Sequence, residues 1–205
     1  NNIKSENLIP IPIYSVIFHA LFFKFFGLSS FFILELIFLY IFLLIIFKIL
    51  TYCKVNYYLA IFFSLSIFIF PSIISNIYFL DINFNIINGL FSFRFPRPLV
   101  TSCYFFWGLY LLIIYSKEEV FKLRNFLLIG LCFSLTFVSY YYNFINLLIL
   151  SFLLLINKVI TKKKYLNNNY INILYSIIVF LLLTLPYLYL YSLSEKDFLS
   201  MIGVI

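Results

Sequence analysis

Two arginines stand close together between apolar segments of this chain, in the stretch FRFPRP at residues 93–98. Arginine carries a permanent charge and a planar fork of donors that suits phosphate or carboxylate groups. Pro96 and Pro98 remove backbone donors and fix φ, which predicts an extended approach to a helix that begins near Leu99. We expect Arg94 and Arg97 to bind an anionic ligand at a membrane boundary. The alternative interpretation is that both arginines only mark the interface by extending toward water.

The cysteines do not point to a metal or to a redox centre. The chain has three of them, Cys53, Cys103 and Cys132, which is an odd number without metal-ligand spacing. Two of them fall inside apolar runs. We therefore predict neither a disulfide nor a zinc site, and we expect no cofactor.

The composition places the chain in a membrane. Of the 205 residues, 65% are hydrophobic and 10% are charged, and several apolar runs reach the length of a spanning helix. The net charge of +7 comes mainly from residues in short segments between these runs. The lipid bilayer is therefore the expected partner, and a nucleic-acid partner is not.

The expected fold is an all-α, polytopic integral membrane helical bundle, a single membrane domain over residues 1–205. The run at 126–160 would be about 52 Å long as one helix, against a hydrocarbon core of about 30 Å, so we predict a turn near residues 139–143. Asn76 to Pro98 is expected to form an outer loop. The predicted spans, about six in number, are residues 31–50, 57–75, 99–116, 126–140, 143–160 and 171–192.

The first apolar segment, residues 9–26, is predicted to lie in the membrane interface and not to cross. Pro10 and Pro12 break its start, His19 and Lys24 interrupt it, and a Gly-Leu-Ser-Ser break at 27–30 follows. We therefore expect one N-terminal interfacial helix before the spans.

Charge sets the orientation. With these spans, nine of the fourteen positive residues fall on one face, which should be cytoplasmic. Arg94 and Arg97 then lie on the extracytoplasmic side, where the orientation rule does not account for them. The nine are Lys48, Lys54, Lys117, Lys122, Arg124, Lys158, Lys162, Lys163 and Lys164.

Two stretches carry a resemblance to a known family. The segment IPIPIY at 9–14, followed by HALFFKFFG at 19–27, resembles the Pro-Pro-Leu-Tyr block and trailing Phe-Gly of GT-C glycosyltransferases, the protein O-mannosyltransferase and aminoarabinose-transferase-like enzymes. The segment LIGLCFSL at 128–135 is similar to that family's Leu-Leu-Gly-Leu-Leu-Gly-Leu stretch. The chain departs from the pattern in its Pro-Ile-Pro spacing and in having Glu35 where an arginine is common.

The resemblance implies an enzyme of the cell envelope, in the inner (plasma) membrane of a bacterium, that takes a sugar from a polyprenyl-phosphate donor. Arg94 and Arg97 would stabilise the leaving lipid phosphate, with Lys24 and His19 as weaker candidates. A lone histidine is more often a packing residue. The family's acidic base lies upstream of its proline block, so we expect the catalytic base upstream of Asn1, and we expect the chain to be an internal fragment.

Two other classes remain open. A lipid-linked saccharide translocase or another polytopic transporter would also need outward arginines for a phosphate, although transporters more often show internal repeats, and no repeat is visible in the sequence. A structural subunit without a ligand is the third class. Whether the chain is an enzyme is thus left open by the residues alone.

Overall fold

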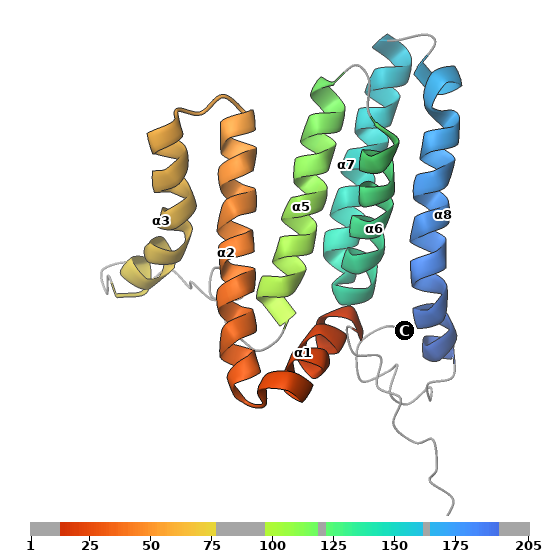
Figure 1. Cartoon of the computed structure of the whole chain (residues 1–205). Coiled ribbons are helices and arrows are strands. Elements are labelled where there is room, and N and C mark those ends of the chain that lie inside the picture. Colours follow the sequence, from red (N-terminus) through yellow and green to blue (C-terminus); the bar gives the residue numbers. More distant parts are fainter. Residues whose placement is uncertain (1–12, 77–96, 119–121, 162–164, 193–205) are drawn as a thin grey trace, which may run out of the picture. The chain divides into compact units, whose positions relative to one another are not determined.

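The computed structural model describes residues 13–76, 97–118, 122–161 and 165–192. Within these ranges every regular element is a helix (Figure 1). The all-α prediction is therefore confirmed for the described residues. The helices are α1 (Ile13–Phe26), α2 (Ser29–Tyr52), α3 (Tyr57–Asn76), α5 (Arg97–Lys117), α6 (Leu123–Ser139), α7 (Tyr141–Thr161) and α8 (Tyr165–Ser192).

The helices group into two compact units, and the division falls within α1. The first, which we call the α2–α5 unit, is residues 18–119 and holds most of α1 together with α2, α3 and α5. The second, the α6–α8 unit, is residues 1–17 and 120–205 and holds the start of α1 with α6, α7 and α8. Each unit is described by itself.

In the α2–α5 unit, α2 packs against both α3 and α5. Phe42, Ile46 and Cys103 form its buried cluster, with further apolar side chains packed around them. Burying such side chains is the main favourable contribution to packing in water, whereas in lipid close van der Waals contact takes over that role.

A tight turn joins α2 to α3. Lys54 adopts a left-handed φ of 65°, and the backbone N–H of Val55 donates to the carbonyl of Leu50 at 3.1 Å. This is a Schellman arrangement, which satisfies carbonyls that the end of a helix leaves unpaired. The side-chain oxygen of Asn56 then accepts from the N–H of Tyr58 at 3.0 Å and caps the start of α3.

In the α6–α8 unit, α6 packs against both α7 and α8. Gly130 on α6 allows the closest approach, because a Cβ atom there would lie 2.3 Å from the backbone oxygen of Ser176 on α8. Aromatic rings pack one turn further along α8: Phe144 stacks on Phe180 at 5.5 Å between centroids, and Phe137 meets Phe180 edge-on at 5.9 Å. Small residues at one level and aromatic rings at another thus hold α8 on α6.

The long apolar run turns where the sequence predicts. Tyr140 is extended, with φ −156° and ψ 99°, and it separates α6 from α7. Its carbonyl accepts from the N–H groups of Asn143 and Phe144, so the first turn of α7 is anchored to it. The predicted break within residues 139–143 is confirmed.

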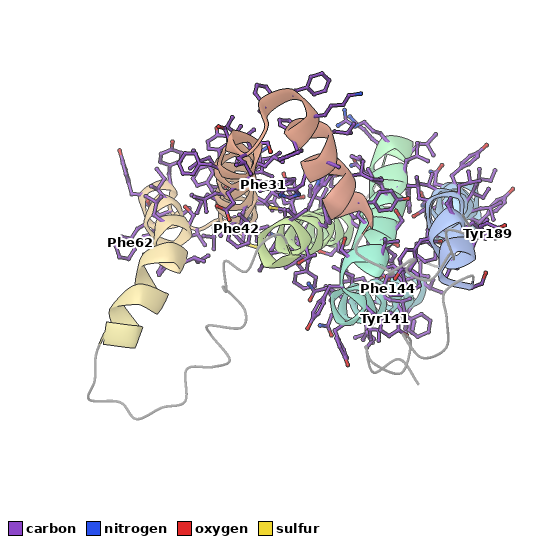
Figure 2. All side chains as sticks on the ribbon, turned by 90° about the horizontal axis from the view of Figure 1, so that it is seen from below. Phe31, Phe42, Phe62, Tyr141, Phe144 and Tyr189 are labelled. Atoms are coloured by element: carbon purple, nitrogen blue, oxygen red, sulfur yellow. The ribbon has the colours of Figure 1, made fainter. Side chains whose placement is uncertain are left out.

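Four helices are long and apolar enough to cross a membrane, by length and composition, among the residues that the structure describes. They indicate an integral membrane protein. Large apolar side chains are exposed on α2, α3, α7 and α8, as Phe62 and Tyr189 show (Figure 2). The four are Ser29–Tyr52, Leu99–Lys117, Tyr141–Thr161 and Asn169–Tyr189.

One local expectation is wrong: the Asn-rich stretch at 165–170, which lies between the predicted spans 143–160 and 171–192, is part of α8, since a helix that has begun gains one hydrogen bond for each added residue. Lys158 lies inside α7, as in the predicted span 143–160, and is 6% exposed. α5 begins at Arg97, close to the start predicted near Leu99. Most of the predicted outer loop, residues 77–96, lies outside the described residues.

Replacing Gly130 by Ala should destabilise the α6–α8 unit. The added methyl would overlap the backbone of Ser176, which cannot move aside as a flexible side chain could, so we expect a loss of about 1–3 kcal/mol. Thermal unfolding of the protein in detergent measures the change. Ser134→Ala is the matched control, because it places an alanine one turn away on the same helix. Equal melting temperatures for Gly130→Ala and the unaltered protein would contradict the close approach of the two backbones.

Candidate functional site

α1 is a short helix that ends sharply. It has 14 residues, which is about 21 Å and less than a spanning helix requires. Gly27 ends it with a left-handed φ of 57°, and its N–H donates to the carbonyl of Phe23 at 2.8 Å. Residues 9–12 of the predicted interfacial segment, with both of its prolines, lie outside the described residues.

His19 is a packed aromatic residue in this structure. It is 6% exposed, and its ring stacks on Phe31 at 6.0 Å and on Phe38 at 6.5 Å between centroids. Phe31 and Phe38 both belong to α2. The surroundings agree with the packing interpretation of a lone histidine.

Lys24, the other candidate on α1, is exposed in the last turn of the helix. A cation is favourable there because the helix dipole leaves negative charge at the C-terminus. Five positions separate Lys24 from His19, which turns them about 140° apart around a helix of 3.6 residues per turn. The structure therefore places them on different faces of α1.

Of the two arginines, only Arg97 falls within the described residues, and only its backbone is described. It is the first residue of α5. Pro98 follows in the first turn, where a backbone N–H would have no acceptor within the helix, so proline is tolerated there. Arg94 lies outside the described residues, so its predicted pairing with Arg97 stays a prediction.

Two contacts show that α2 and α5 run parallel. The thiol of Cys103 lies 3.3 Å from the carbonyl oxygen of Phe38, and the ammonium of Lys117 donates to the carbonyl of Tyr52 at 3.0 Å. The partners are 65 positions apart in both pairs. A constant separation at both levels requires two helices that point the same way in register.

Parallel packing brings the start of α5 to the end of the unit where α1 turns into α2 (Figure 1). Arg97 and Lys24 therefore belong to the same end of the α2–α5 unit. Glu35, exposed in the second turn of α2, lies at this end too. α5 begins here, so its unpaired N–H groups and the positive end of its dipole add to the cationic side chains. At the start of α2, the N–H groups of Ser30 and Phe31 already donate to the carbonyls of Gly27 and Leu28.

The opposite end holds lysines with a different role. Lys117 donates to the last carbonyl of α2, and its ammonium lies 4.9 Å from the centroid of the Tyr52 ring. It thereby satisfies a carbonyl that the helix end leaves unpaired and complements the negative dipole end. Lys48 and Lys54 are exposed near the same end of α2. The unit thus separates a lysine-rich end from the end with Arg97 and Lys24.

A hydrogen bond that the sequence does not predict joins the start of α1 to α8. The hydroxyl of Tyr14 donates to the carbonyl of Leu183 at 2.6 Å, within the α6–α8 unit. Pro186 lies three residues later, where a proline loosens the backbone hydrogen bonds of a helix. Burial raises the pKa of Tyr14, so its hydroxyl keeps its proton and remains a donor. Tyr14 belongs to the proline block that carries the family resemblance.

The described residues contain no group of three or more His, Cys, Asp or Glu side chains that could hold a metal ion. The three cysteines are free thiols, of which Cys53 is exposed and Cys103 and Cys132 are buried. The arrangement offers cationic groups and backbone donors for an anion.

No family model, no curated protein and no solved structure matches the chain.

Cysteine labelling should show that the two ends of α2 face opposite sides of a membrane. α2 has 24 residues, about 36 Å, with Leu28 80% exposed before its start and Cys53 exposed after its end. In intact cells, an impermeant maleimide should label Leu28→Cys and leave Cys53 unlabelled, while inverted vesicles should show the reverse.

Each thiol is measured alone, with every other cysteine of the full-length protein replaced by serine. Labelling of Leu28→Cys and Cys53 from the same side would contradict a crossing by α2.

Proposed function

We propose that the chain is part of a GT-C-type membrane glycosyltransferase that moves a sugar from a polyprenyl-phosphate donor to an acceptor on the extracytoplasmic side. The observation that carries the proposal is that the α2–α5 unit has different groups of cationic residues at its two ends. One end gathers Arg97, Lys24 and the starts of two helices, and the other gathers Lys48, Lys54 and Lys117. The resemblance of the segments at 9–27 and 128–135 supplies the reaction class.

The proposed topology has six spans and one interfacial helix, α1. α2, α5, α7 and α8 contain the four long apolar segments. α3, with 20 residues, and α6, with 17, are the other two spans in this proposal. Excess lysine at one end is typical of the cytoplasmic side, so the Arg97 end would face outward. We place the protein in the inner (plasma) membrane of a bacterium.

In this proposal the donor binds with its phosphate at the Arg97 end. When the sugar is transferred, the bond between the sugar and the phosphate oxygen breaks, and negative charge develops on the lipid phosphate. Arg94 and Arg97 would stabilise that charge through paired donors, in an environment where water is scarce and such interactions are strong. Lys24 adds a further positive charge at the same end. The base that activates the acceptor is expected upstream of Asn1.

A translocase of lipid-linked saccharides is the second candidate, and one observation favours it. In both units the first helix packs on the second and on the third: α2 on α3 and α5, and α6 on α7 and α8. Internal repeats are common in transporters. The structure thus offers a repeat in packing that the sequence does not show.

Arg→Lys substitutions test whether the arginines act through their planar donor forks. If Arg94 and Arg97 bind the phosphate with paired donors, lysine keeps the charge but loses the fork. The loss of a charge-assisted hydrogen bond costs about 1.5–3 kcal/mol, or roughly tenfold to a hundredfold in turnover. The measurement is sugar transfer from a polyprenyl-phosphate donor by the full-length protein in membranes, normalised to expression.

Arg124→Lys is the matched control, since Arg124 is exposed in the first turn of α6 and should tolerate the change. Full activity of both Arg94→Lys and Arg97→Lys would leave the arginines as interface markers. If the protein moves the lipid-linked sugar across vesicle membranes without transferring the sugar, the translocase assignment would replace the glycosyltransferase assignment.

A further inference from the structure

Tyr104 carries a buried hydroxyl group that makes no hydrogen bond in the part of the chain that the structure describes. The residue is 6% exposed in the second turn of α5. Several serine and threonine hydroxyls in these helices donate to a carbonyl three or four residues earlier in their own helix, which is the usual solution in apolar surroundings. They include Thr51, Ser64, Ser66, Ser134, Thr136 and Thr184. Ser139 on α6 is buried without a partner among the described residues. Tyrosine cannot reach its own backbone in this way, so Tyr104 needs another acceptor.

The position of Tyr104 connects it to the start of α5. Residues 97, 101 and 104 are spaced four and three apart, so they share one face of the helix. The residues that contact α2, namely Cys103 and Phe106, lie on another face. Long side chains in a helix lean toward its N-terminus. The ring of Tyr104 is therefore expected to extend toward the turn that begins with Arg97.

A second unpaired hydroxyl lies at the same end of the α2–α5 unit. Ser30, in the first turn of α2, is 0% exposed, and its hydroxyl also has no partner among the described residues. In the register that places Phe38 beside Cys103, Tyr104 lies nine positions, or about 14 Å, further along the helix pair than Ser30, so the two hydroxyls are separate observations. The unpaired N–H groups and the dipole at the start of α5 favour an anion. A neutral donor near positive charge suits a phosphate group, which presents several acceptor oxygens.

We infer that Tyr104 donates its hydroxyl to a phosphate oxygen of an anionic lipid bound at the start of α5. The inference rests on the proposed function for the class of lipid, a polyprenyl phosphate, but it requires only binding and no sugar transfer. Arg97 would supply the charge, and Tyr104 would fix the depth of the phosphate along the helix, about 10 Å from the first residue.

The test measures binding of radiolabelled polyprenyl phosphate to the full-length protein in phosphatidylcholine nanodiscs. Tyr104→Phe removes the hydroxyl and keeps the ring, and it should weaken binding roughly tenfold to a hundredfold. Its melting temperature should stay the same or rise, because an unpaired buried hydroxyl stabilises nothing. Tyr110→Phe is the matched control, because Tyr110 lies on the same helix and contacts Tyr52 of α2.

Tight binding that Tyr104→Phe weakens and Tyr110→Phe does not would support the inference, even if the protein transfers no sugar. Unchanged binding by Tyr104→Phe, equal losses in both variants, or no binding by the unaltered protein would overturn it. Inorganic phosphate is the competing probe. If it displaces the lipid at similar concentrations, the ligand is a soluble phosphate and the lipid assignment fails.

Discussion

The parallel pairing of α2 and α5 decides where the charges of the α2–α5 unit lie. The contacts Phe38 to Cys103 and Tyr52 to Lys117 hold two helices in register although they are far apart in the sequence. The same register brings Arg97 to the end where α1 meets α2. It also lets Lys117 satisfy the last carbonyl of α2, where a cation complements the dipole. If α5 were shifted along α2 by one turn, Arg97 would no longer lie at this end and Lys117 would no longer reach the last carbonyl of α2.

The helices of the two units are held together by different kinds of contact. In the α2–α5 unit, α2 and α5 are joined by apolar rings and a thiol, with Phe42 meeting Phe106 at 5.4 Å between centroids. In the α6–α8 unit a glycine lets two backbones meet, and aromatic rings pack beyond it. Close backbone approach and good van der Waals contact are what remain when lipid surrounds both helices and water provides no driving force.

The hydroxyl groups show where the fold satisfies its own hydrogen-bond donors and where it does not. Where serine and threonine bond back to their own helix, as at Thr136 and Thr184, the group is satisfied without tertiary contact. Ser30, Tyr104 and Ser139 are different, because the hydroxyl of each is buried without a partner among the described residues. A ligand site needs donors whose requirements the fold has not already met. Of these three, Ser30 in the first turn of α2 and Tyr104 in the second turn of α5 lie toward the Arg97 end.

The sequence alone determined the helical membrane class and most helix positions. Long apolar runs can satisfy their backbone only as helices, and Gly27 and the region of Tyr140 interrupt them for local reasons. It could not show that α8 begins at Tyr165 or that Lys158 is buried, because propensity is weak where packing decides. Only the tertiary structure packed His19 against the rings of α2 and aligned Arg97 with the start of α2. Those results depend on which helices pack together and in what register, and neither is encoded in local periodicity.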